Sequence, residues 1–140
     1  MDSQQGGYQG LLVIGDPHLE SRVPGFRKDN YPRVVLDKVA WCLNYANEHG
    51  LLPVFLGDIF HLPRDNANWL LGELMVLFHR GVVGIYGNHD VRQNELTEDD
   101  SLDVLVKAGK YQLLDSEHVW SGEIGGRLVV VGGTSWGRML

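Results

Sequence analysis

The apolar residues of the chain form blocks of two kinds. Short apolar runs, which have the length of buried strands, occur at residues 11–14, 52–56 and 82–86. In the longer segments between them, residues 33–49 and 67–79, apolar residues recur at helical spacing. Pro32 and Gly50 lie where a helix over the first of these segments would begin and end. The pattern therefore predicts three strands alternating with two helices.

That order, with short connections, is typical of a parallel sheet with helices packed against it. Right-handed crossovers would place successive strands side by side, with their carboxyl ends along one edge. Farther along, the pattern predicts a short helix near residues 101–108 and strands at 111–114, 118–120 and 128–132. The sequence contains no internal repeat and no linker-like segment. We therefore predict an α/β fold in which nothing marks a second domain within residues 1–140.

Each of the three predicted strands is followed by polar residues of the same few types. The chain reads GDPH after the first strand, GDIFH after the second and GNHD after the third. The candidate side chains are Asp16 and His18, Asp58 and His61, and Asn88, His89 and Asp90. Ligands of open α/β sheets bind at the carboxyl ends of strands, so these side chains should share one rim. A glycine precedes each group and would allow a tight exit and close approach of the backbone.

Asp16 and His18 illustrate the convergence, because residues two apart in extended backbone project to the same side. Each piece also has a structural interpretation: Asp-Pro begins many turns, and an aspartate before a helix is often an N-cap. The recurrence of the pattern at three strand ends favours a shared chemical role.

Carboxylate, imidazole and amide donors together suit a divalent ion such as manganese, iron or zinc. Two divalent cations balanced only by Asp16 and Asp58 would keep a positive charge, which suits a hydroxide and a phosphate oxygen. Asp58 follows the middle strand, so it is the candidate bridge between the two ions. This chemistry indicates a two-metal hydrolase.

Composition limits the partners. The net charge is −6 and no basic patch is evident, whereas acidic residues cluster between residues 95 and 103. Nucleic-acid binding through phosphates would need basic surface that these residues do not show. The first ten residues are polar and Gly-rich, no apolar run reaches membrane-span length, and Cys42 is the single cysteine. We expect a cytoplasmic protein with no membrane segment, in which Cys42 is a small core residue.

The motifs GDPH, GD and GNHD, in this order, resemble those of the calcineurin-like metallophosphoesterase superfamily. The resemblance implies a β-sandwich flanked by helices and two-metal hydrolysis of phosphate esters. It also implies that Asp16 and His18 bind the first metal, that Asp58 bridges and that Asn88 binds the second. His89 would contact the phosphate or protonate the leaving oxygen.

In the same comparison, Asp90 would orient His89 or its loop. The segment GDIFHLPR is similar to a stretch of the SbcD-type DNA-repair nucleases, with Arg64 at a comparable position, and so is SLDVLVKAGKYQLLD after the last motif. In that comparison His61 faces the site and assists nucleolysis. The alternative for His61 is a hydrogen-bonded loop histidine.

The chain departs from the family where a later histidine and a Gly-His-x-His stretch would complete the site. The remaining histidines do not match these positions: we interpret His49 and His79 as cations at helix ends, and His118 as structural. The sequence therefore resembles the N-terminal half of such a domain. We expect these 140 residues alone to be inactive and to self-associate, with a dimer mate or partner chain completing the site.

The function predicted from the sequence is divalent-metal-dependent phosphodiester hydrolysis, with a phosphate ester, including DNA, as substrate and manganese as the expected metal. Two alternatives stay open. One is a protein or small-molecule phosphatase of the same superfamily, which the absence of a basic surface leaves open. The other is a non-catalytic half-site that binds a partner.

Overall fold

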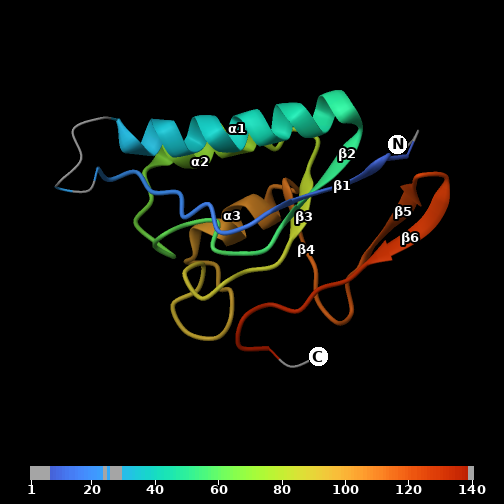
Figure 1. The fold of residues 1–140 in the computed structure, drawn as a ribbon. Coiled ribbons are helices and arrows are strands. Elements are labelled where there is room, and N and C mark those ends of the chain that lie inside the picture. The colour runs from blue at the N-terminus through green and yellow to red at the C-terminus, as the bar shows by residue number, and fades with distance from the viewer. Residues whose placement is uncertain (1–6, 24, 26–29, 139–140) are drawn as a thin grey trace.

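The computed structural model describes residues 7–23, 25 and 30–138 and shows a mixed α/β fold (Figure 1). The strands are β1 (Gly10–Ile14), β2 (Leu51–Phe55), β3 (Val82–Gly84), β4 (Tyr111–Leu113), β5 (Trp120–Ile124) and β6 (Arg127–Val131). The helices are α1 (Tyr31–His49), α2 (Asn68–Leu77) and α3 (Ser101–Lys107). The predicted alternation of strands and helices is confirmed.

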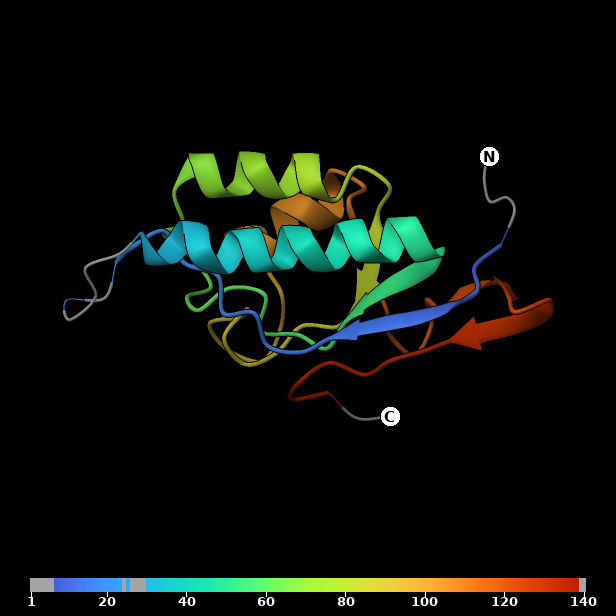
Figure 2. The same ribbon diagram turned by 45° about the horizontal axis from the view of Figure 1, so that its top comes forward.

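The first four strands form one parallel sheet in the order β1-β2-β3-β4, and β5 and β6 pair as an antiparallel hairpin. Because β1, β2 and β3 are neighbours and run the same way, the loops that follow them leave from one edge. Figures 1 and 2 show the three helices on one face of the sheet and the hairpin on the other. The predicted common edge is therefore confirmed.

The sheet has a hydrophobic core on each face. On the helical side, Phe55 packs in a cluster with buried residues of all three helices, among them Leu43, Leu74 and Leu105. On the other side, a smaller cluster of Leu52, Val54, Val83 and Leu114 meets Trp120 and Val131 of the hairpin. Because β2 is covered on both faces, its sequence is a continuous apolar run rather than an alternating one.

Helix α1 follows the expected rules at both ends. Pro32 lies in its first turn, and Gly50 ends it in the left-handed conformation with φ of 65°. The Gly50 N–H donates to the carbonyl groups of Ala46 and Asn47, two of the last acceptors of the helix. The buried stripe of α1 comprises Pro32, Leu36, Val39, Leu43 and Ala46. Cys42, by contrast, is half-buried rather than a core residue.

Two strand predictions need correction. β3 ends at Gly84 rather than at residue 86, because the backbone leaves the sheet and the Tyr86 N–H donates to the Ser135 hydroxyl at 3.0 Å. β5 spans Trp120–Ile124 rather than residues 118–120. The Asp115 carboxylate accepts the N–H groups of Glu117 and His118, each at 2.8 Å, and so folds that segment into a turn.

Among the described residues, none of the helices combines the length and apolar character that crossing a bilayer would require.

Candidate metal centre

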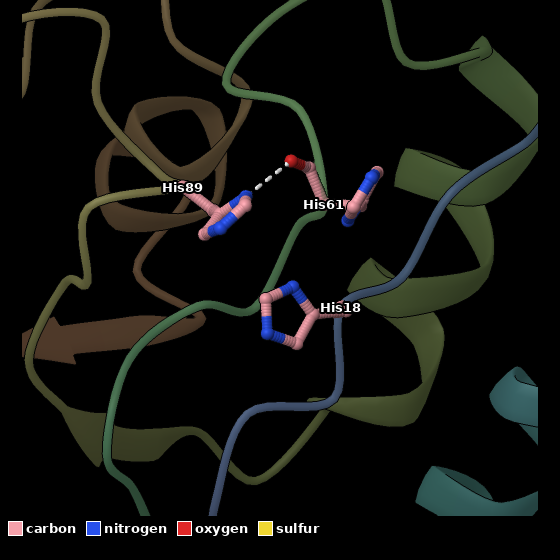
Figure 3. Close-up of side chains that lie close together, drawn as sticks. All are labelled: His18, His61 and His89. Carbon is pink, nitrogen blue, oxygen red and sulfur yellow. Dashed lines mark hydrogen bonds between the residues drawn. The ribbon is translucent and has the colours of Figure 1, made fainter.

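The loops after β1, β2 and β3 bring the sequence-predicted side chains together in two groups. The first, which we call the carboxylate group, comprises Asp16, His18 and Asp58, whose candidate ligand atoms all lie within 4.8 Å of one another. The second, which we call the imidazole group, comprises His18, His61 and His89, whose candidate ligand nitrogens also lie within 4.8 Å of one another (Figure 3). His18 belongs to both groups.

The first two loops are held by backbone pairing that continues past the ends of the strands. The His18 N–H donates to the Asp58 carbonyl at 2.9 Å, and the His61 N–H donates to the Leu19 carbonyl at 2.9 Å. Leu19 and Phe60 form an isolated parallel bridge between these two hydrogen bonds, and both side chains are fully buried. Buried Leu19 and Phe60 therefore anchor the two loops, and the polar side chains project from hydrogen-bonded backbone.

The backbone at the site is left-handed at non-glycine residues. Asp16, His18 and Asp58 have φ values of 42°, 49° and 50°. Such a conformation costs on the order of 1–2 kcal/mol per residue and persists only where the surroundings impose it. The extended backbone that we assumed for Asp16 and His18 is therefore wrong, although the two side chains do converge.

Two of the three glycines that precede the polar residues lie where a side chain would clash with a neighbouring loop. At the third there is room for a Cβ. A Cβ on Gly57 would lie 2.6 Å from the Gly87 nitrogen, and one on Gly87 would lie 2.6 Å from Cγ of Asp58. A Cβ on Gly15 would meet only Cδ1 of Leu56, at 4.0 Å. Hence the second and third loops pack directly on each other, whereas Gly15 occupies an open position.

Asp58 lies at the centre of the site and is mostly buried. Its Oδ1 accepts the His89 N–H at 2.8 Å, and its Oδ2 lies 3.8 Å from Nε2 of His18. A carboxylate held by a backbone N–H on one oxygen keeps its other oxygen directed at a neighbour. Asp58 thereby joins the loop after β2 to both flanking loops.

Asp90 is fully buried and ties two loops together. Its carboxylate accepts the Phe60 N–H at 3.0 Å and the Gly87 N–H at 2.9 Å. Burial raises the pKa of Asp90 to about 6, although the N–H donors favour the ionised form. Of the two roles expected for Asp90, these bonds correspond to orienting the loop rather than the His89 ring.

The His89 ring is oriented by a backbone carbonyl instead. Its Nδ1 lies 2.9 Å from the carbonyl oxygen of His61, shown by the dashed line in Figure 3. Because a carbonyl can only accept, Nδ1 carries the proton, and in the neutral ring Nε2 keeps its lone pair. The two rings are also stacked, with centroids 5.3 Å apart and an interplanar angle of 23°. The sequence contains no signal for this contact.

The other residues singled out from the sequence have structural surroundings. Asn88 is exposed in the turn that carries His89. The Arg64 guanidinium donates to the buried carboxylate of Asp100 at 3.1 Å. His118 lies 2.9 Å from Asp115, and the Glu117 N–H and His118 hold the pKa of that carboxyl below its usual range.

His49, in the last turn of α1, has Nδ1 2.9 Å from the carbonyl oxygen of Tyr45. His79 follows the end of α2, and its N–H donates to the Val76 carbonyl.

An open groove of about 790 Å³ begins at the imidazole group. It is lined by His18, Glu20, Arg22, Val23, Tyr31, His61, Leu62 and His89. Arg22 gives this groove a cation beside the histidines. Sequence reasoning did not assign Arg22 or Tyr31 to the site, because the segment that carries them has neither strand nor motif signals.

A scan against known protein families finds no matching family, and a search of curated proteins finds no match. The chemistry of the site is therefore inferred from the geometry of its residues.

Proposed function

We propose that the protein is a divalent-metal-dependent phosphoesterase that acts on phosphate diesters. The single observation that carries this proposal is the convergence of Asp16, His18 and Asp58 at adjoining strand ends, with ligand atoms within 4.8 Å of one another. Two carboxylates and an imidazole suit manganese, and iron and zinc are also compatible. The order of the motifs supports membership of the calcineurin-like metallophosphoesterases.

In this proposal Asp16, His18 and Asp58 hold the first cation, and Asp58 and Asn88 contribute to a second. A bound divalent ion would supply polarisation of a phosphate oxygen and a nucleophilic water at neutral pH. The second cation has only two protein donors among the described residues, and Asn88 is exposed. We propose that further donors, from a partner chain or another segment, complete it.

His89 is the proposed group for contact with the phosphate. The His61 carbonyl, 2.9 Å from Nδ1, fixes the proton on that nitrogen and would stabilise the ring when it becomes charged. In the charged ring Nε2 also carries a proton, which it can donate to a phosphate or leaving-group oxygen. His61 and Arg22 line the same groove as His89, and Arg22 can pair there with a second anionic group of the substrate.

The hairpin supports the proposed β-sandwich. Trp120 and Val131 cover the face of the sheet opposite the helices, as a second sheet would. We propose that β5 and β6 begin that second layer.

The donor count favours one further candidate, a metal-dependent phosphate-binding module that lacks turnover. Both candidates require that Mn²⁺ recruits a phosphate diester to this edge. They differ in whether the diester is cleaved once the second cation is complete.

The test is binding of bis(p-nitrophenyl) phosphate to the chelator-stripped protein, with and without Mn²⁺. We expect binding only with Mn²⁺ and its loss in Asp58→Asn, while Asp37→Asn, on an exposed position of α1, behaves as wild type. Binding that does not depend on Mn²⁺, or that survives in Asp58→Asn, would refute both candidates. Release of nitrophenol would favour the enzyme over the binding module.

A further inference from the structure

The imidazole group consists of His18, His61 and His89 and shares only His18 with the carboxylate group. The three histidines follow three neighbouring strands, and their candidate ligand nitrogens lie within 4.8 Å of one another. The ring centroids of His18 and His89 are 4.7 Å apart, and those of His18 and His61 are 5.6 Å apart. Three imidazoles at such separations are a donor set for a nitrogen-preferring cation rather than for manganese.

The two ring nitrogens of His18 face different neighbours. Its Nε2 lies 3.8 Å from Oδ2 of Asp58. Its Nδ1 is buried and has no hydrogen-bond partner within the part of the chain that the structure describes. Figure 3 shows this Nδ1, the nitrogen next to the side-chain stem, directed toward the space between His61 and His89. A buried polar atom without a partner is costly, so a ligand at this nitrogen would remove a penalty.

His89 is already prepared as a ligand. Its Nδ1 proton is donated to the His61 carbonyl, which leaves the Nε2 lone pair available. Metal-bound histidines usually donate their other ring N–H to a carbonyl or carboxylate in this manner. The third member, His61, is exposed, and its candidate ligand nitrogen lies within 4.8 Å of those of the other two histidines.

We infer that His18, His61 and His89 form a zinc site that is distinct from the carboxylate group and excludes it. A neutral imidazole has one lone pair. When Nδ1 of His18 binds zinc, Nε2 carries the proton and faces Asp58, and it can no longer bind a cation held by Asp16 and Asp58. When Nε2 binds that cation, Nδ1 is protonated and cannot bind zinc. The tautomer of His18 selects the site.

This exclusivity has a regulatory consequence that rests on the proposed function. Zinc would bind His89, which contacts the phosphate in the proposed reaction. It would also prevent His18 from binding Mn²⁺ together with Asp16 and Asp58. Zinc is therefore an inhibitor of this protein, and manganese relieves the inhibition by competition.

The experiment measures zinc and manganese binding to the stripped protein without substrate. We expect His61→Ala to weaken Zn²⁺ by at least about 100-fold, since even the outer partners of metal ligands are worth about 10–100-fold. The same variant should retain Mn²⁺ affinity, whereas Asp16→Asn should lose Mn²⁺ and retain Zn²⁺. His49→Ala and His118→Ala are the matched controls and should change neither affinity.

Competition provides the second measurement. In wild type, Zn²⁺ should raise the apparent dissociation constant of Mn²⁺, and this effect should be smaller in His61→Ala, in which only Zn²⁺ bound directly at Asp16 and Asp58 still competes. Nitrogen-15 spectra of the wild-type histidine rings serve if a variant fails to fold: Zn²⁺ should shift His18, His61 and His89 but not His118. Equal Zn²⁺ affinity in wild type and His61→Ala, or additive binding of both metals, would overturn the inference. Neither result depends on whether the protein hydrolyses a phosphate ester.

Discussion

The β5–β6 hairpin and the edge of the sheet that carries the candidate site differ in how regular their backbone is. The hairpin is regular: β5 and β6 pair in register from Trp120↔Val131 to Ile124↔Arg127, around a turn with positive φ at Gly125 and Gly126. Its outer face nevertheless exposes Leu128 and Val130, with 82% and 63% of their surface accessible.

At the carboxyl edge of the sheet the situation is reversed. The backbone is left-handed at three non-glycine residues, yet Asp58 and Asp90 are held by backbone N–H groups. Strain that is kept in place by such bonds is characteristic of functional sites. The hairpin satisfies local rules and leaves a surface uncovered, whereas the edge departs from local rules to bring polar groups together.

Gly87→Ala should disturb the carboxyl edge of the sheet and leave the hairpin intact. The added Cβ would lie 2.6 Å from Cγ of Asp58, so the two loops must separate. We expect Mn²⁺ binding to be lost and the free energy of unfolding to fall by about 1–3 kcal/mol. Gly15→Ala, whose Cβ has room, is the matched control and should keep Mn²⁺ binding. The comparison fails if the two variants behave alike in metal titration and thermal unfolding.

The buried Asp90 should give the metal-free protein an unusual pH dependence. Its pKa is raised to about 6 in the fold from an ordinary value of 3.8, so the folded state binds more protons between these values. Stability contributed by this group is therefore lost as the pH rises from about 4 to about 6, by up to about 3 kcal/mol, and is constant above that window. Urea unfolding across this range, with Asp90→Asn as comparison, measures it. A wild-type profile as flat as that of Asp90→Asn would show that Asp90 does not titrate in this window.

His89→Ala should separate binding of the phosphate ester from binding of the metal. The ring is not part of the carboxylate group, so Mn²⁺ affinity should stay close to that of wild type. Loss of one hydrogen bond to a charged group should weaken Mn²⁺-dependent diester binding by about 10–100-fold. Calorimetry with each ligand distinguishes the two affinities. If Mn²⁺ affinity falls as far as diester affinity, His89 is a metal ligand in this site.

The smallest effect concerns the hairpin. Leu128→Lys replaces an exposed apolar side chain, so the free energy of unfolding should change by less than about 0.5 kcal/mol. We expect wild type to self-associate through this face and the variant to do so less, as measured by sedimentation. Mn²⁺ binding should not change. Unaltered self-association would place the contact on another surface.

Periodicity and strand order could be predicted from the sequence because burial controls them. The stripe of α1, its end at Gly50 and the parallel order of β1, β2 and β3 follow from apolar spacing and crossover geometry. The edge residues could also be selected, since polar residues directly after buried strands have few packing roles.

The geometry of the site could not be predicted in the same way. Left-handed φ at Asp58 occurs where two loops that are distant in sequence pack on each other, at the close approach of Gly57 and Gly87. The His61 carbonyl that orients His89 belongs to the backbone and has no residue signature. Strand ends shifted for a related reason: Ser135 and Asp115 supply side-chain partners that replace the ladder.

Calorimetric titration with Mn²⁺ measures whether Asp16, His18 and Asp58 hold a divalent cation at the carboxyl edge of the sheet. The stripped wild-type protein should bind one Mn²⁺ per chain, and Asp58→Asn should bind none in the same concentration range, with Asp37→Asn unchanged. Equal stoichiometry and affinity in wild type and Asp58→Asn would show that these residues do not hold the ion.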